Sequence, residues 1–98
     1  MTITKNFCEE CVCNFKFSDN QVFNYQRISG INYFSVCIQL KDIVSFQINC
    51  DELSLKVSIF TLNKEIILYD KNYLLYGQQN SLVEDLKSWQ EIEALFSK

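Results

Sequence analysis

Residues 53–62 read LSLKVSIFTL, and as far as Ile59 apolar and polar side chains alternate with a period of two. In an extended chain this spacing places the apolar residues on one face and the polar residues on the other. The apolar face would carry Leu53, Leu55, Val57 and Ile59, and the opposite face Ser54, Lys56 and Ser58. The pattern predicts a half-buried β-strand, and a similar alternation extends from about Val12 to Asp70.

Working outward from this strand, short alternating runs are separated by polar turns such as Ser18–Gln21 and Asn63–Lys64. A further run, Tyr73–Tyr76, fits either a seventh short strand or a loop packed under the segment that follows it. The sequence therefore predicts strands over about 11–70, at Cys11–Phe17, Val22–Ile28, Tyr33–Leu40, Ile43–Asn49, Leu53–Leu62 and Glu65–Asp70.

The period changes at Ser81, after which apolar residues recur at helical spacing. They are Leu82, Leu86, Trp89, Ile92 and Phe96. Ser81 with Glu84 three residues later fits a capping box, and Glu84 and Asp85 suit the positive end of a helix dipole. We therefore predict one amphipathic helix over about 82–97, with Ser81 as its capping residue.

Strands followed by one helix predict an α+β fold that is mostly β, in a single domain spanning residues 1–98. We expect a single antiparallel β-sandwich or partly open barrel of about six to seven strands, capped by the C-terminal amphipathic helix. Over roughly residues 11–97 this layout, with a tryptophan on the inner helix face, resembles the pleckstrin-homology-like architecture. Phosphoinositide-binding members carry a basic first hairpin, whereas this chain has only Lys16 beside Ser18–Gln21, so lipid binding does not follow.

The composition disfavours several classes of partner. The 98 residues carry a net charge of -3, and Arg27 is the only arginine, so neither nucleic acid nor a membrane is expected as a direct partner. No run of about 18 apolar residues is present, and the first residues do not resemble a signal peptide. We therefore expect a cytoplasmic protein.

Five cysteines include a C-x-x-C pair, and Cys8, Cys11 and Cys13 are weak candidates for metal ligands. Either Cys37 or Cys50 could complete a set of four. However, Cys11 and Cys13 fall in phase with the core-facing positions of their predicted strand, where buried free thiols are the simpler interpretation. We expect no metal and no cofactor.

Catalysis is not expected either. The chain contains no histidine, so a cysteine nucleophile would lack its usual activating base. The acidic pairs Glu9–Glu10, Asp51–Glu52 and Glu84–Asp85 lie at predicted turns or at the helix start, where solubility and capping explain them. We predict that the protein is not an enzyme and has no catalytic residues.

By elimination, the sequence favours a protein-binding domain, with an exposed aromatic surface or an acidic helix face as the contact. The candidate partner-binding residues are Phe60, Tyr73, Tyr76, Glu91 and Glu93. The leading hypothesis is a small acidic inhibitor, of the immunity-protein or phage anti-defence (anti-CRISPR) type, that covers a functional surface of another protein such as a basic nuclease or nucleic-acid-handling effector. The alternatives are a structural or adaptor module of a larger assembly and a zinc-stabilised domain using the N-terminal cysteines.

Overall fold

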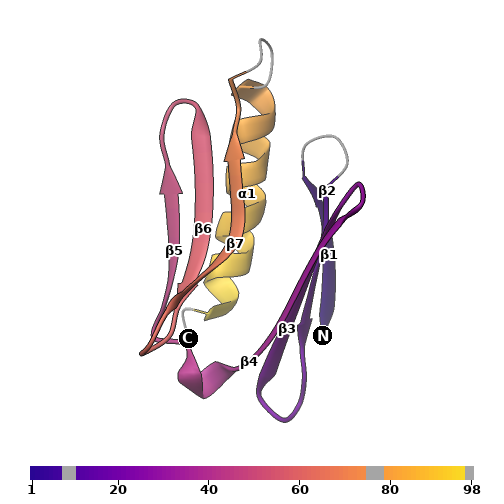
Figure 1. Cartoon of the computed structure of the whole chain (residues 1–98), viewed down its shortest axis with the longest axis vertical. Helices are drawn as coiled ribbons and strands as arrows, with labels where there is room; N and C mark the ends of the chain where they lie inside the picture. Colours follow the sequence, from indigo (N-terminus) through magenta and orange to yellow (C-terminus); the bar gives the residue numbers. More distant parts are fainter. Residues whose placement is uncertain (8–10, 75–78, 97–98) are drawn as a thin grey trace. The chain divides into compact units, whose positions relative to one another are not determined.

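The computed structural model describes residues 1–7, 11–74 and 79–96 (Figure 1). The described residues form antiparallel strands followed by one C-terminal helix, which confirms the mostly-β α+β class. In chain order the elements are β1 (Thr2–Phe7), β2 (Cys11–Phe17), β3 (Val22–Ser29), β4 (Asn32–Gln39), a 3-10 turn η1 (Leu40–Asp42), β5 (Ser45–Cys50), β6 (Ser54–Phe60), β7 (Glu65–Asn72) and α1 (Gln79–Phe96). No helix among these residues is long and apolar enough to cross a membrane.

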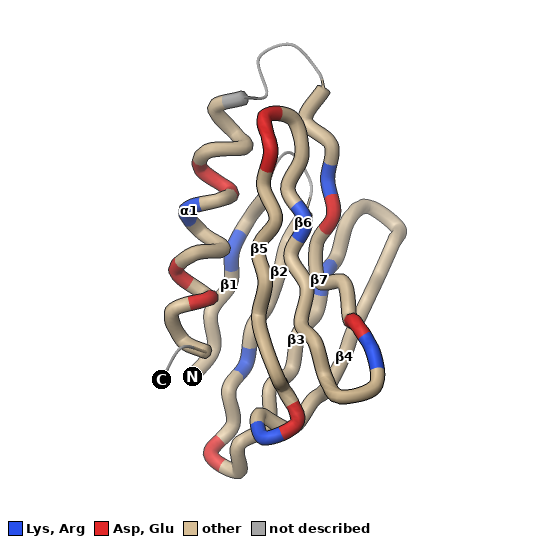
Figure 2. The backbone as a smooth tube through the Cα atoms, turned by 90° about the vertical axis from the view of Figure 1, so that its left-hand side faces the viewer, with Lys and Arg blue, Asp and Glu red and all other residues tan. Residues whose placement is uncertain are grey.

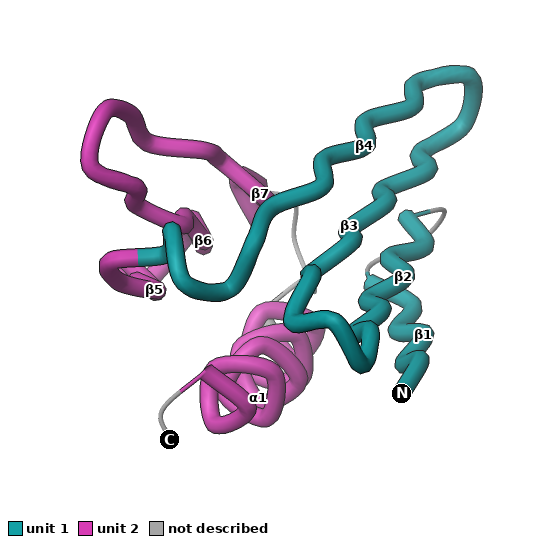
Figure 3. Tube along the Cα trace, turned by 90° about the horizontal axis from the view of Figure 1, so that it is seen from below, with its two compact units in different colours: residues 1–43 teal, residues 44–98 magenta. Residues whose placement is uncertain are grey.

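The chain divides into two compact units, residues 1–43 and residues 44–98 (Figure 3). The first contains a four-stranded sheet of order β1-β2-β3-β4, and the second a three-stranded sheet of order β5-β6-β7 together with α1. The single domain and the closure of the sheets into a sandwich or barrel stay predictions.

One face of the four-stranded sheet is lined by aromatic rings. Phe15 pairs with Tyr25 across β2 and β3, and Phe23 lies beside both rings. The Phe15 and Tyr25 ring centroids are 5.2 Å apart in a tilted arrangement, a favourable geometry for aromatic pairs. All three side chains are fully buried. The predicted inward face of the first alternating run is therefore confirmed.

The prediction that strands begin at about residue 11 was wrong, because β1 precedes them. It pairs with β2 from Thr2 opposite Lys16 to Phe7 opposite Cys11. The register places Lys5 opposite Cys13, on the aromatic face of the sheet, where apolar residues are usual. A lysine can occupy such a position by burying its alkyl stem, but it interrupts the alternation by which strands are found in a sequence.

The β3–β4 hairpin depends on a glycine. Ser29 pairs with Asn32, leaving Gly30 and Ile31 as a two-residue loop. Gly30 has a φ of 59°, whereas Ile31 does not share this positive φ. A positive φ at the first central residue alone is the arrangement of a type II′ turn, which favours glycine there and fits the twist of a hairpin.

The three-stranded sheet packs its buried face against α1 in Figure 1. Leu55, Val57 and Ile59 of β6 are fully buried, as their alternation predicts. On β7 the register shifts opposite Val57 and Ser58, and Leu68 and Tyr69 are both buried although they are adjacent. A β-bulge has this effect, because the extra residue changes which positions face the core.

Three further predictions about local structure were wrong. Helix α1 begins at Gln79, so Ser81 and Glu84 lie inside it and do not form a capping box at its start. Gln79 and Asn80, which precede Ser81, are neither glycine nor proline, so neither residue prevents helical dihedral angles. Val44 falls within the predicted strand Ile43–Asn49, but it precedes β5 and is exposed.

Candidate functional site

The face of the four-stranded sheet opposite the aromatic rings is polar and almost uncharged. We call it the outer face. One of its cross-strand rows consists of Thr4, Asn14, Gln26 and Ser35. Within this row the Thr4 hydroxyl lies 2.8 Å from the Asn14 side-chain oxygen, to which it donates a hydrogen bond. Amide and hydroxyl groups of this kind form adaptable hydrogen bonds with a protein partner.

Apolar side chains gather at one end of the outer face, on the β3–β4 hairpin. Ile28 and Tyr33 are cross-strand partners, and Ile31 lies in the loop between them. Their exposed fractions are 38% for Ile28, 61% for Tyr33 and 100% for Ile31. Single exposed apolar residues are ordinary, but three on one hairpin form a patch. We call these three residues the hairpin cluster, and it is our candidate functional site.

The sequence contained a signal for this cluster that the sequence analysis missed. Ile31 follows Gly30 in a tight turn, where a side chain has no sheet face to point into. A β-branched apolar residue at that position is therefore exposed wherever the hairpin forms. The alternation of the predicted strand Tyr33–Leu40 also directs Tyr33 outward, but its position opposite Ile28 follows only from the register with β3.

The prediction of Tyr73 as a partner-binding residue was wrong, because this side chain lies in the core of residues 44–98. Its side chain is 1% exposed, and its hydroxyl donates a 2.6 Å hydrogen bond to the Asp85 carboxylate. The Tyr69 hydroxyl lies 2.7 Å from that of Tyr73 and 3.4 Å from the same carboxylate oxygen. Asp85 is itself buried, so it is not part of an exposed acidic face of α1.

The other predicted contact residues remain untested. Phe60 is half-buried at the end of β6, Glu91 is exposed on α1, and Glu93 is half-buried on the same helix. Tyr76 lies outside the described residues.

The N-terminal cysteines do not form a suitable metal site within the described residues. Cys8 lies outside them, and elsewhere no group of three or more His, Cys, Asp or Glu side chains could hold a metal ion. Cys13 is fully buried, and its sulfur lies 3.3 Å from the Tyr25 hydroxyl. A hydrogen bond with Cys11 and burial raise the pKa of the Cys13 thiol far above its ordinary value. Zinc binds the thiolate, so Cys13 would have to lose its proton in this buried position beside the Tyr25 hydroxyl to become a ligand.

Two buried tyrosines make stability depend on alkaline pH. Burial raises the pKa of Tyr25 and of Tyr73 well above the ordinary value of 10.0, and hydrogen bonds to Cys13 and Asp85 respectively contribute to the rise. In the unfolded chain both phenols ionise near pH 10, whereas in the folded chain they stay protonated, so the stability present below pH 10 is lost as pH rises above it. We expect the free energy of unfolding to fall by about 1.4 kcal/mol per pH unit for each tyrosine.

Denaturant titrations between neutral pH and pH 11.5 would measure this loss. The exposed Tyr33 provides a matched control, because Tyr33→Phe should leave the alkaline slope unchanged while Tyr25→Phe and Tyr73→Phe each reduce it. A slope that is the same in all three variants would contradict the assignment to the buried phenols.

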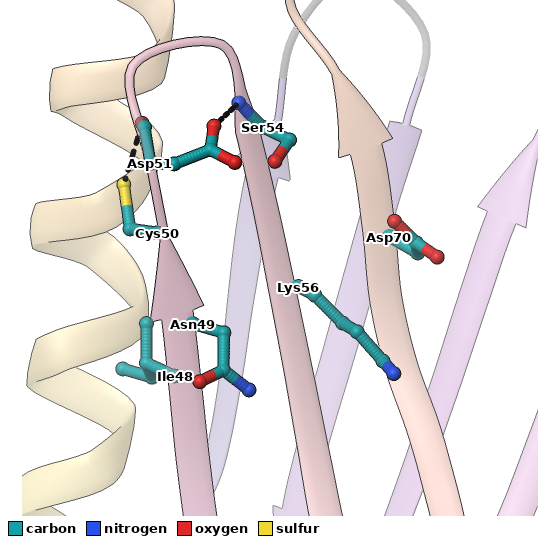
Figure 4. Close-up of a pocket in the computed structure, with 7 residues that line it drawn as sticks. All are labelled: Ile48, Asn49, Cys50, Asp51, Ser54, Lys56 and Asp70. Carbon is teal, nitrogen blue, oxygen red and sulfur yellow. Dashed lines mark hydrogen bonds between the residues drawn. The ribbon is translucent and has the colours of Figure 1, made fainter.

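A shallow pocket lies on the three-stranded sheet, with a volume of about 470 Å³ (Figure 4). Its Asp51 carboxylate accepts the backbone N–H groups of Leu53 and Ser54 at 2.9 and 2.8 Å, which lowers its pKa and shapes the β5–β6 turn. Lys56, which also lines it, pairs with Glu65 at 3.3 Å. The Asp51 carboxylate and the Lys56 ammonium of the pocket are therefore both engaged in interactions within the three-stranded sheet.

Charge is distributed unequally between the two units. Residues 1–43 contain four basic and four acidic residues, whereas residues 44–98 contain five basic and eight acidic ones. Along α1, acidic positions lie on both sides of a single basic one (Figure 2). The excess negative charge of the protein therefore resides in the unit that contains the helix.

The chain matches no protein-family model, no curated protein and no solved structure. The resemblance to the pleckstrin-homology-like layout accordingly rests on the order of strands and helix alone.

Proposed function

We propose that this protein is a non-catalytic protein-binding domain that acts as a small inhibitor, covering a functional surface of another protein. The hairpin cluster of Ile28, Ile31 and Tyr33 carries the proposal. It exposes apolar side chains next to a polar, almost uncharged sheet face, which matches the division of a protein interface into an apolar centre and a polar rim. Tyr33 would serve as the central anchor, because tyrosine buries a large ring while its hydroxyl keeps a polar partner.

The charge of the protein supports a basic partner. The negative excess in residues 44–98, including Glu91 and Glu93 of α1, would attract a positively charged surface during encounter. A nuclease or another nucleic-acid-handling effector presents such a surface, because it must hold phosphate groups. In this proposal the acidic residues accelerate association and the hairpin cluster holds the complex together.

The proposal is tested by replacing Ile31 and Tyr33 with serine and measuring capture of a partner from lysate of the native host. We expect the captured partner to decrease by about tenfold or more, because truncating a central apolar anchor costs at least about 1.4 kcal/mol of binding. Quantitative mass spectrometry of the eluates measures this decrease. Adding the wild-type protein to the captured partner should then suppress its activity, and the double variant should suppress it less.

Leu62 supplies the matched control, because it is 90% exposed but belongs to the β6–β7 turn and not to the β3–β4 hairpin. Leu62→Ser should bind like the wild type. Equal capture by the wild type and the double variant would reject the cluster as the contact surface. An eluate that contains only this chain would reject the inhibitor and favour the structural module.

A further inference from the structure

We propose that two copies of the chain pair antiparallel through β4, forming a two-fold dimer with one continuous sheet. This inference concerns the backbone edge of β4, whereas the proposed inhibitor function uses only the Tyr33 side chain of that strand. It rests on the absence of charge along β4, on the direction of its backbone groups and on its self-complementary side chains.

The two edges of the four-stranded sheet differ in their protection against pairing. Edge strand β1 carries Lys5 on its aromatic face, and inward-pointing charges of this kind discourage the addition of another strand. The opposite edge strand, β4, reads NYFSVCIQ and contains neither charge nor proline. Nothing in its sequence therefore opposes a further strand.

The edges of the three-stranded sheet are less suited to pairing. Edge strand β7 carries Glu65, Asp70 and Lys71. The other edge, β5, is uncharged but only six residues long, and α1 packs against it. The ring centroids of Phe46 on β5 and Phe96 on α1 are 4.8 Å apart, so α1 packs on one face of this strand.

Alternate residues of β4 direct their backbone groups to the open edge. In a two-residue hairpin the residues that flank the loop, here Ser29 and Asn32, exchange backbone hydrogen bonds. Residue pairs of antiparallel strands alternate between hydrogen-bonded and non-hydrogen-bonded pairs. The even-numbered residues of β4 therefore form backbone hydrogen bonds with β3. The N–H and C=O groups that point away from β3 belong to Tyr33, Ser35, Cys37 and Gln39.

A two-fold axis at Val36 pairs β4 with itself in one register that uses all four of these residues. Tyr33 then lies opposite Gln39 of the second copy, and Ser35 lies opposite its Cys37. On the aromatic face Phe34 meets Ile38, and the two Val36 side chains meet at the axis. On the aromatic face apolar residues therefore meet apolar ones, and on both faces no like charges are opposed.

Such a dimer would place both outer faces on the same side of an eight-stranded sheet. Each copy would contribute its own hairpin cluster to that side. The dimer would thus be bivalent towards a partner that offers two copies of its binding surface.

Sedimentation equilibrium of the purified full chain over a range of concentrations tests the proposal. We expect a dimer that dissociates on dilution, and the double variant Ser35→Lys, Cys37→Lys should raise its dissociation constant at least about tenfold by opposing like charges across the axis. The control Asn24→Lys, Gln26→Lys places the same charges on the neighbouring positions of β3, where dimerisation should persist. A monomeric wild type, or equal dissociation in both variants, would overturn the proposal.

A thiol trap tests the register without adding charge. Ser35→Cys places a new thiol opposite Cys37 of the second copy, at a separation that a disulfide can span. Mild oxidation should produce a covalent dimer, and peptide mass spectrometry should find the bridge between positions 35 and 37. Absence of that bridge would overturn the pairing centred on Val36. Because the Ile31 and Tyr33 serine variant should still dimerise, failure of partner capture and failure of self-pairing are distinguishable.

Discussion

Replacing Trp89 with alanine is expected to lower the free energy of unfolding by about 3–5 kcal/mol, the usual cost of truncating a large buried aromatic side chain. Trp89 is fully buried, with its ring centroid 5.6 Å from that of Tyr69 and 6.4 Å from that of Phe46. Alanine would leave a cavity between α1 and two strands of the three-stranded sheet. Urea unfolding followed by far-ultraviolet circular dichroism measures the loss, since Trp89 is the only tryptophan and its fluorescence disappears with it.

Val83 provides the control on the same helix. Its side chain is 50% exposed, so Val83→Ala should change the free energy of unfolding by less than about 0.5 kcal/mol. A Trp89→Ala variant that unfolds at the same urea concentration as Val83→Ala would contradict the burial of the tryptophan.

The inner faces of the strands were predictable because alternation with a period of two reports directly which side of a strand is buried. Cys11–Phe17 was predicted with the bounds that β2 has, and Leu55, Val57 and Ile59 of β6 face the core as expected. The helical spacing likewise placed Trp89 inward. In each case the spacing of apolar and polar residues depends on which side of the element faces solvent and not on one particular neighbouring residue. It could therefore be interpreted without knowing how the elements pack.

Features that depend on one specific neighbour were not predictable. Lys5 faces the aromatic side of its sheet, so β1 lacks the alternation that would reveal it. The bulge on β7 changes the phase of the strand at Leu68 and Tyr69, and it brings the odd-numbered Tyr69 and Tyr73 onto the buried side. The bulge can be recognised only when the pairing of β6 with β7 is known. The sequence alone therefore misassigned Tyr73 to the surface.

The candidate site illustrates the same division. Elimination from composition favoured a binding surface, but the residues that form the hairpin cluster are separated by a turn and meet only through the pairing of β3 with β4. Its position next to the almost uncharged outer face follows from the pairing of all four strands. The spacing of residues along the chain predicts the β3–β4 turn, but it does not predict which residues of the four strands share the outer face.

Asp85→Ala is expected to lower the free energy of unfolding by about 1–3 kcal/mol, because it removes the acceptor of a buried tyrosine hydroxyl. The Tyr73 hydroxyl donates to this carboxylate, and Tyr69 is close enough to share it, so the group links β7 and the residues after it to α1. Asp85→Asn keeps one acceptor oxygen and should cost less than the alanine variant. Urea unfolding at pH 7 measures both losses.

Glu84 is the matched control, since it is the adjacent acidic residue on α1 and is exposed. Glu84→Ala makes the same change in net charge and should leave stability within about 0.5 kcal/mol of the wild type. Combining Asp85→Ala with Tyr73→Phe completes a double-mutant cycle, in which the hydrogen bond should contribute a coupling energy of about 0.5–3 kcal/mol. Additive losses in that cycle would mean that the carboxylate stabilises the fold by some route other than the Tyr73 hydroxyl.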